Sequence, residues 1–217
     1  MKAPDNAQAR MNQMYRHQRR IYDVTRRYYL LGRTSLIGKL APPSGGSVLE
    51  IGCGTASNLI AIAARYPDAR LFGFDISTEM LATAAQSVAR QGAANRIALS
   101  TGDATQFDGT VMFGQSGFDR IVTSYTLSMI HDWPRVLDEA ARHLRPGGSI
   151  HIVDFGDCAR LPRWVKRGLY SWLNTFNVTP RQDLEGQLLS FAARNGLDLM
   201  HTPLFAGYAQ YAVLTRQ

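Results

Sequence analysis

The chain has 217 residues, of which 45% are hydrophobic, as is typical of one globular α/β domain with its own core. It contains no run of about 18 apolar residues, and its two cysteines, Cys53 and Cys158, have neither a disulfide nor a metal-ligand pattern. These features exclude a spanning helix, a disulfide scaffold and a cysteine-based metal site. With no apolar signal segment, we expect a cytoplasmic protein.

The formal net charge of +7 lies in the first 40 residues, which hold nine Lys or Arg and two acidic residues. The rest of the chain holds 15 basic and 15 acidic residues, so its balance is zero. A segment of this charge is attracted to an anionic surface, either a membrane or a nucleic acid.

Within this basic segment, residues 11–29 have a helical pattern. Apolar and aromatic residues, among them Met14, Tyr15 and Tyr22, recur every three or four positions, and five arginines lie on the adjoining flank. This pattern favours an interfacial helix, in which arginines contact phosphate head groups. An equally weighted alternative is a helix docked on its own domain with a solvated basic face. We assign residues 1–40 to a helical lid, with a turn at Gly32 and a second short helix, and residues 41–217 to the main domain.

The main domain begins with an apolar run that ends in a glycine turn, Val48-Leu-Glu-Ile-Gly-Cys-Gly-Thr-Ala-Ser-Asn58. Gly52 and Gly54 allow a sharp turn and a close approach of a ligand to the backbone. The helix that follows has unpaired N–H groups at its first turn, which suit an anionic or polar ligand group. Glu50, at the strand end, is placed to fix the loop or to meet a cationic ligand group.

A second strand, residues 70–76, ends in Asp75, about 20 residues after the glycine turn. An acidic residue at this spacing can accept hydrogen bonds from both hydroxyls of a ribose. The alternatives are another nucleotide-binding fold or a strand–turn–helix unit without a ligand.

Strand and helix patterns then alternate, which predicts a parallel sheet with helices on both faces. Further strands are expected at 97–100, 118–127 and 149–155, the last after a turn at 145–148, with a helix from Ser77, a helix from Pro134 to Leu144 and a helix over 183–194. A hairpin around Gly207, with strands 198–204 and 208–216, ends the chain. Residues 156–182 form an insertion with an aromatic stripe at helical spacing, which Arg160, Arg163, Lys166 and Arg167 surround. We expect this insertion on the substrate side or, alternatively, as a cap helix without a partner.

These motifs, together with Leu144-Arg-Pro-Gly-Gly148, resemble those of the class I S-adenosylmethionine-dependent methyltransferases over residues 48–155. The resemblance implies an α/β, Rossmann-like doubly wound seven-stranded sheet, mostly parallel with the last strand antiparallel, and S-adenosylmethionine as cofactor. One departure is Ala56, which replaces the third glycine of the first motif. The implied cofactor-binding residues are Glu50, Gly52, Cys53, Gly54, Asn58, Asp75, Ile76, Met80, Asp103, Ala104, Ser124, Tyr22 and Arg33.

The stretch from Met11 to Arg33 is similar to the N-terminal signature of bacterial betaine-lipid N-methyltransferases. This resemblance implies the addition of three methyl groups to the amino group of diacylglyceryl-homoserine at an anionic membrane surface. We therefore expect peripheral association with the inner face of the membrane and neither a metal nor a nucleic-acid partner. The candidates for orienting or deprotonating the acceptor, or for surrounding the quaternary amine, are Tyr125, His131, Tyr15, Tyr28 and Tyr29.

Three other interpretations remain open. Tyr22 and Gly32 also fit the pattern of ubiquinone and menaquinone C-methyltransferases. A phosphatidylethanolamine N-methyltransferase is a further possibility within the same class. A nucleic-acid-binding role for the basic helix belongs to a different class, and no RNA-binding module supports it.

Overall fold

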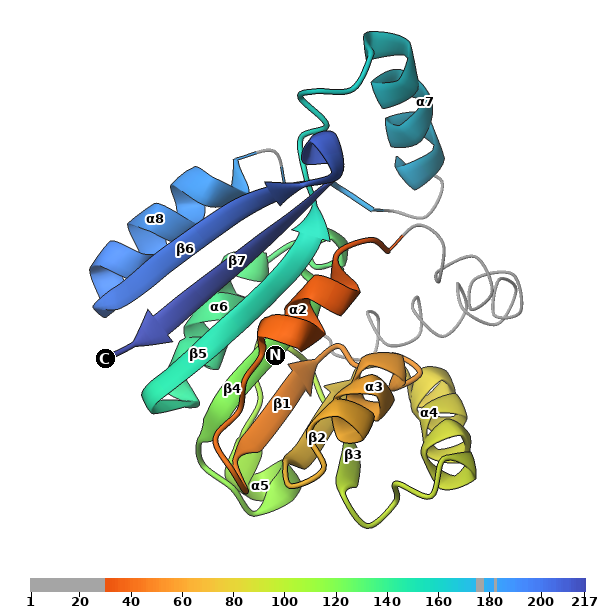
Figure 1. Cartoon of the computed structure of the whole chain (residues 1–217), viewed down its shortest axis with the longest axis vertical. Coiled ribbons are helices and arrows are strands. Elements are labelled where there is room, and N and C mark those ends of the chain that lie inside the picture. The colour runs from red at the N-terminus through yellow and green to blue at the C-terminus, as the bar shows by residue number, and fades with distance from the viewer. Residues whose placement is uncertain (1–29, 175–177, 182) are drawn as a thin grey trace, which may run out of the picture.

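The computed structural model describes residues 30–174, 178–181 and 183–217 (Figure 1). The expected helix over residues 11–29 lies outside the described residues, together with Tyr15, Tyr22, Tyr28 and Tyr29. Among the residues that are described, no helix is long and apolar enough to cross a membrane.

Seven strands form one sheet in the order β3-β2-β1-β4-β5-β7-β6. The strands are β1 (Ser47–Ile51), β2 (Arg70–Asp75), β3 (Ile97–Thr101), β4 (Phe118–Ser124), β5 (Leu144–Phe155), β6 (Leu197–Leu204) and β7 (Ala209–Arg216). The first five strands are parallel, whereas β7 is antiparallel to both β5 and β6. The predicted fold class is therefore confirmed, including the antiparallel last strand.

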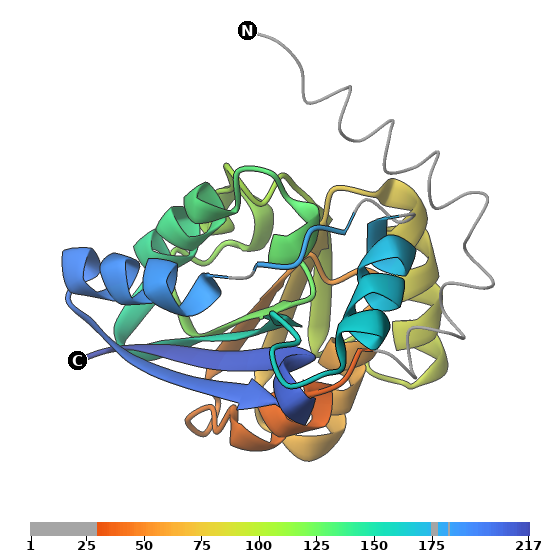
Figure 2. The ribbon, with the colours of Figure 1, turned by 90° about the horizontal axis from the view of Figure 1, so that it is seen from above.

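Helices cover both faces of this sheet, as Figure 2 shows from above. The helices are α2 (Arg33–Lys39), α3 (Ser57–Arg65), α4 (Thr78–Arg90), α5 (Gly109–Phe113), α6 (Trp133–Arg142), α7 (Arg163–Asn174) and α8 (Leu184–Asn195), with 3-10 turns η1 (Leu127–Met129) and η2 (Phe205–Gly207). One core cluster lies under α2, α3 and α4, and the other under α5, α6 and α8.

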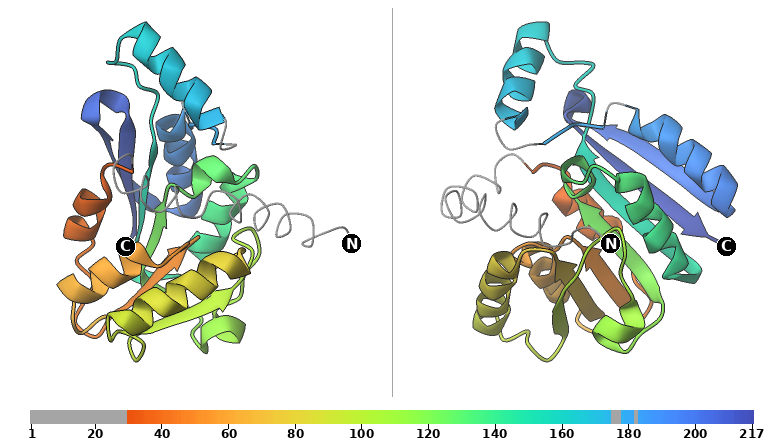
Figure 3. Two further views of the ribbon diagram at one scale, coloured as in Figure 1. Left: turned by 90° about the vertical axis from the view of Figure 1, so that its right-hand side faces the viewer. Right: turned by 180° about the vertical axis from the view of Figure 1, so that it is seen from behind.

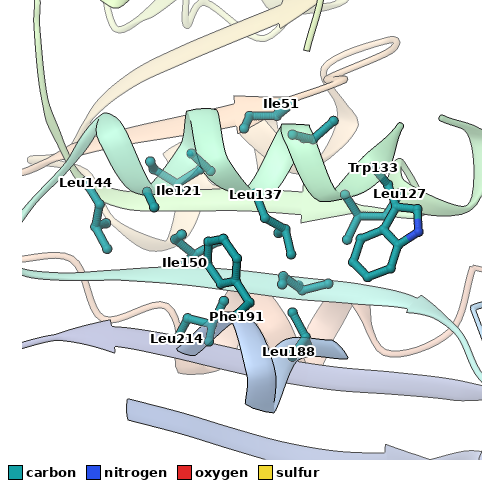
Figure 4. Packing of buried hydrophobic residues seen from close by; sticks show 14 of the residues in the cluster. Ile51, Ile121, Leu127, Trp133, Leu137, Leu144, Ile150, Leu188, Phe191 and Leu214 are labelled. Carbon is teal, nitrogen blue, oxygen red and sulfur yellow. The ribbon is translucent and has the colours of Figure 1, made fainter. Parts of the chain in front are cut away.

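The central strand β1 is buried along its whole length and serves both cores. Val48 belongs to the cluster under α2 and α3, whereas Leu49 and Ile51 belong to the cluster under α6 and α8. Alternate side chains of a strand point to opposite faces, so a continuous apolar run is what a strand covered on both sides requires. Figure 4 shows the second cluster, with Trp133 and Phe191 packed over the sheet.

Local signals explain where several helices begin and end. The Ser77 hydroxyl accepts the N–H of Met80, so the predicted cap of α4 is confirmed. Pro134 lies in the first turn of α6, as expected, although the helix starts at Trp133. Gly196 ends α8 in the left-handed conformation that glycine adopts without strain.

The structure differs from the sequence-based assignment in two places. β5 begins at Leu144 rather than Ser149, and its register with β4 shifts between the pairs Phe118–Leu144 and Arg120–Ser149. The expected turn at 145–148 is therefore an irregularity within the strand, because pairing exists on both sides of it. Helix α5 was not expected; it is short and is capped by Asp108, whose carboxylate accepts the N–H groups of Thr110 and Val111.

The insertion forms α7, which rises beyond the carboxyl end of β5 and stands apart from α6 and α8 (Figure 3). Leu161 of the aromatic stripe precedes the helix, and Phe176 lies outside the described residues. That α7 covers a substrate stays a prediction.

Candidate cofactor site

Most of the predicted site residues follow the carboxyl ends of β1, β2, β3 and β4. These four strands are parallel neighbours, so their ends meet at one edge of the sheet. This edge of an open parallel sheet is where ligands bind.

The glycine turn after β1 packs closely against β2 and against the loop that follows β4. Gly52 has a φ of +69°, and a Cβ at this position would lie 2.6 Å from Cγ2 of Thr126. The N–H of Cys53 donates to the carbonyl of Phe74 on β2 at 2.9 Å. A residue with a side chain at position 52 would therefore have a strained backbone, and its Cβ would collide with Thr126, which follows β4.

Ala56 occupies the position before α3 in the left-handed conformation, with φ 61° and ψ 21°. Glycine adopts this conformation freely, whereas alanine does so at a cost of order 1–2 kcal/mol. The replacement of glycine by Ala56 therefore preserves the turn but introduces backbone strain at the candidate site.

The first turn of α3 has no side-chain cap among the described residues. In contrast, α4 is capped by Ser77. The uncapped N–H groups of α3 lie next to the glycine turn, so they fit the polar end of a ligand bound there.

Four side chains connect β1 with α3 and α2. Glu50, only 2% exposed, accepts the side-chain N–H of Asn58 at 2.6 Å. Asn58 Oδ1 accepts Arg33 Nε at 2.6 Å, and a second guanidinium nitrogen of Arg33 donates to Ser57 Oγ at 2.6 Å. Residues predicted from distant parts of the sequence thus form one hydrogen-bonded line beside the glycine turn.

The Asp75 carboxylate joins the end of β2 to the same turn. Its Oδ2 accepts the N–H of Gly54 and its Oδ1 accepts the N–H of Ser77, both at 2.9 Å. Each carboxylate oxygen has more than one acceptor site, and the side chain is half-buried, which is compatible with the predicted contact to a ribose. These residues fit a nucleoside with a charged polar tail.

The other predicted adenine-side residues occupy the ends of β2 and β3 and the first turn of α4. Ile76 and Asp103 are half-buried, whereas Met80 and Ala104 are buried. One oxygen of Asp103 accepts the N–H and the hydroxyl of Thr105 at 2.9 and 2.8 Å. The Asp103 carboxylate therefore stabilises the loop that follows β3.

At the end of β4, Ser124 and Tyr125 are both buried. The Tyr125 hydroxyl donates to the carbonyl of Leu31 at 2.5 Å, and its ring packs edge-on against Phe155. Burial, together with the nearby Asp154 carboxyl, raises the pKa of Tyr125 well above its usual range. The phenol therefore stays protonated, which suits orienting a substrate better than removing a proton.

His131 is exposed in the turn between η1 and α6. None of the hydrogen bonds of the described residues joins it to the other candidates. The structure thus brings the cofactor-side candidates together but does not link His131 to them.

Sequence analysis missed Asp154, which lies fully buried near the end of β5. Its carboxylate accepts the N–H groups of Ser128 and Phe155 at 3.0 and 2.8 Å, and burial raises its pKa to about 6. Arg181 fixes the same loop by donating to the carbonyls of Leu127 and Ile130. The sequence signal that could have identified Asp154 is its place near the end of the apolar run 149–155, because Glu50 and Asp75 lie near the ends of β1 and β2 in the same way.

Outside this edge, an open pocket of about 270 Å³ lies between α6 and α8. Trp133, Asp183 and Arg194 are among its lining residues, and none of the predicted site residues is. Within the described residues, no three His, Cys, Asp or Glu side chains gather as metal ligands.

Comparisons with known proteins agree with the fold. Residues 48–148 match a protein-family model described as a methyltransferase domain. A ubiquinone/menaquinone biosynthesis C-methyltransferase of Paracoccus denitrificans is 30% identical over 148 residues, covering 68% of this chain and 56% of that protein. A phosphatidylethanolamine N-methyltransferase of Cereibacter sphaeroides is 36% identical over 110 residues, or 51% of each chain. The chain therefore spans little more than half the length of these curated relatives.

A solved structure with the same fold is phosphoethanolamine N-methyltransferase 2 of Haemonchus contortus in complex with S-adenosyl-L-methionine. It superposes with a TM-score of 0.69 at 17% identity, covering 85% of this chain and 52% of that chain. At this identity the similarity concerns the fold.

Proposed function

Because the chain belongs to the class I S-adenosylmethionine-dependent methyltransferases, we propose that it adds three methyl groups to the amino group of diacylglyceryl-homoserine. The product is the betaine lipid diacylglyceryl-trimethylhomoserine. On this proposal the protein works as a peripheral enzyme at the inner face of a membrane.

The observation that carries the choice of acceptor is a similarity to a lipid N-methyltransferase. Among the two relatives described above, the phosphatidylethanolamine N-methyltransferase has the higher identity, 36%, and its name specifies an amine on a lipid. The similarity of the stretch Met11–Arg33 to the signature of betaine-lipid enzymes supports a homoserine lipid as the acceptor in this proposal. The positive charge of the first 40 residues supports an anionic surface as the place where the lipid is met.

We assign the cofactor to the edge formed by β1, β2 and β4. Asp75 would bind the ribose hydroxyls, Asp103 and Ala104 the adenine, and Arg33 with the first turn of α3 the methionine carboxylate. The bound cofactor supplies a methyl group activated by a positively charged sulfur. The contribution of the protein is orientation, which can lower a barrier by about 7–11 kcal/mol.

In each transfer the nitrogen lone pair of the acceptor forms the new N–C bond while the C–S bond breaks and its electron pair stays on sulfur. A proton must leave the acceptor nitrogen before each attack, so three protons are released for three methyl groups. Tyr125, protonated and hydrogen-bonded to Leu31, is assigned to orientation at the end of β4. His131 is the remaining candidate for accepting protons.

Positive charge persists on the nitrogen after the third transfer, because a quaternary amine has no proton to lose. Aromatic faces attract such cations. We assign this role to Tyr15, Tyr28 and Tyr29, and we assign Tyr22 to the closure of the cofactor site.

A second candidate is methylation of a carbon in a quinone precursor. The match to the C-methyltransferase of Paracoccus denitrificans favours it, because that match covers more of this chain, 68% against 51%. Both candidates share the cofactor site, and they differ in the acceptor molecule and in the atom that attacks.

Incubation of the protein with S-adenosylmethionine labelled in its methyl group and a panel of detergent-dispersed acceptors tests the proposal. The panel contains diacylglyceryl-homoserine, phosphatidylethanolamine and a demethylated quinone. Label in a trimethylated homoserine lipid supports the proposal, whereas label only in the quinone or in phosphatidylethanolamine overturns it. Asp75→Ala, in which we expect weakened cofactor binding, serves as the low-activity reference, and Asp68→Ala, at an exposed turn, as the active control.

A further inference from the structure

Helix α7 presents an outward face that the proposed chemistry does not use. We propose that this face docks the protein on an anionic lipid bilayer. The inference deepens the proposed function, since it names the described surface through which a lipid-borne acceptor would be reached.

The face combines tryptophan and arginine side chains. Trp164 is 79% exposed and Trp172 is 38% exposed, and Arg163 and Arg167 are exposed as well. At 3.6 residues per turn these four positions fall within one half of the helix. The opposite half carries Leu173, which belongs to the core cluster beneath, and Leu169, which packs against that cluster.

The charged residues of α7 and of the segment that leads into it have one sign. Between Cys158 and Asn174 the chain has four basic residues, Arg160, Arg163, Lys166 and Arg167, and no acidic residue. Basic side chains near an anionic membrane surface are attracted to it. The tryptophans beside them are the residues that prefer the boundary between head groups and acyl chains.

A second segment extends the apolar surface at the base of α7. Phe205, in the turn between β6 and β7, is 52% exposed. The N–H of Arg160 donates to the carbonyl of Ala206 at 3.3 Å, and the N–H of Cys158 donates to the carbonyl of Gly207 at 2.9 Å. The start of the insertion is thus fixed to the tip of the hairpin, which places Phe205 beside the path that leads into α7.

The other end of the insertion is fixed to the candidate site. The N–H of Thr179 donates to the carbonyl of Ser128 at 3.0 Å, in the loop that leaves β4. Arg181 binds the carbonyls of the same loop. A bilayer bound to α7 would therefore lie at the carboxyl edge of the sheet, where the acceptor must enter.

The same features argue against a nucleic acid as the occupant. A nucleic-acid surface needs base-stacking aromatics within a basic groove. The tryptophans of α7 are instead exposed, and the helix itself stands away from the sheet (Figure 1). An apolar face flanked by arginines on a helix standing clear of the sheet is the arrangement of an interfacial helix.

Tryptophan fluorescence tests the proposal directly, because the three tryptophans of the chain are Trp133, Trp164 and Trp172. Trp133 is 5% exposed and acts as an internal reference, and the basic stretch 1–40 contains no tryptophan, so it cannot produce the signal. Vesicles of phosphatidylglycerol and phosphatidylcholine should shift the emission of the full chain to the blue and protect it from acrylamide. Trp164→Phe should remove most of this shift.

Charge reversal by Arg163→Glu with Arg167→Glu should reduce vesicle partitioning by at least about 30-fold. Arg90→Glu, at an exposed position of α4, is the matched control and should leave partitioning close to that of the unaltered chain. Sedimentation with vesicles without a change in tryptophan emission would place the contact elsewhere and overturn the proposal. A shift caused by a single-stranded RNA but not by vesicles would overturn it as well.

The failure of this proposal can be told apart from failure of the proposed function. With the acceptor dispersed in detergent, the charge-reversed protein should still methylate it, because docking is then unnecessary. If the unaltered protein shifts its emission on vesicles but labels none of the acceptors, docking stands and the proposed function fails.

Discussion

Arg33 Nε donates to Asn58 Oδ1 at 2.6 Å, although the two residues are 25 positions apart. Asn58 in turn donates to the buried carboxylate of Glu50 at 2.6 Å. The start of α2 is therefore connected through α3 to the strand end beneath the glycine turn. This connection makes the lid side of the molecule part of the candidate cofactor site.

Replacing Arg33 by alanine should weaken S-adenosylmethionine binding by roughly 10- to 100-fold, because hydrogen bonds of a charged group to Asn58 and Ser57 are lost. Calorimetric titration measures the affinity. Lys39→Ala, at an exposed position at the end of the same helix, should bind the cofactor as the unaltered protein does. Equal affinities for Arg33→Ala and Lys39→Ala would refute the role of the Arg33 connection.

Alanine substitutions at two glycines near Arg33, Gly32 and Gly38, should have opposite effects on the free energy of unfolding. Gly32 has a φ of +88°, and a Cβ there would lie 2.9 Å from Val153 Cγ2 and 3.0 Å from Leu204 Cδ1. Gly32→Ala should lower the free energy of unfolding by about 2 kcal/mol or more. Gly38, inside α2, has nothing within 4 Å of a Cβ, so Gly38→Ala should raise it by up to about 1 kcal/mol. Urea unfolding of both variants checks the contrast, and a loss of stability at both positions would contradict it.

Asp75 has a structural role as well as a proposed ligand role. Asp75→Ala removes the acceptor of the Gly54 N–H and the proposed ribose contact, so cofactor affinity should fall by about 1–3 kcal/mol. Asp75→Asn retains one acceptor oxygen and should fall between alanine and the native residue. Calorimetry that finds Asp75→Ala no weaker than the native protein would remove Asp75 from the site.

Two buried groups on β5 should respond to pH in opposite directions. Burial lowers the pKa of His151 from 6.5 to about 3 and raises the pKa of Asp154 from 3.8 to about 6. The folded state prefers neutral His151, so its contribution to stability is present above pH 6.5 and is lost as the pH falls toward 3. The folded state also prefers protonated Asp154, so that contribution is present below pH 3.8 and is lost as the pH rises through 6.

Between pH 3.8 and 6, His151 makes the stability of the native protein rise with pH, whereas Asp154 makes it fall with pH. Asp154→Asn should therefore make stability fall more steeply with acid, by about 1.4 kcal/mol per pH unit. His151→Gln leaves only the Asp154 contribution, so its stability should increase as the pH falls from 6 to 3.8. Denaturant unfolding across this range measures both slopes, and curves parallel to that of the native protein would contradict the assignment.

Strands β1, β2 and β3 were predictable because each is a short run that ends in an acidic residue or is followed by a glycine. The glycine turn, Asp75 and the cap at Ser77 follow from local sequence alone. The left-handed conformation of Ala56 did not, because the pattern shows only that a glycine has been replaced.

Contacts that depend on how helices dock on the sheet were beyond sequence analysis. The bond from Arg33 to Asn58 requires α2 to lie beside α3, and the burial of Asp154 requires the loop after β4 to fold over β5. The irregularity in β5 was also hidden, since Arg145-Pro-Gly-Gly148 has the composition of a free turn although strand pairing exists on both sides of it.

Titration of S-adenosylmethionine into the full chain, followed by calorimetry, tests the central claim that this nucleoside binds at the carboxyl ends of β1, β2 and β4. We expect saturable binding at one site that is weakened by both Arg33→Ala and Asp75→Ala, which lie on different elements but meet at the glycine turn. Absence of binding by the unaltered chain, or binding by both variants as strong as that of the unaltered chain, would contradict the account.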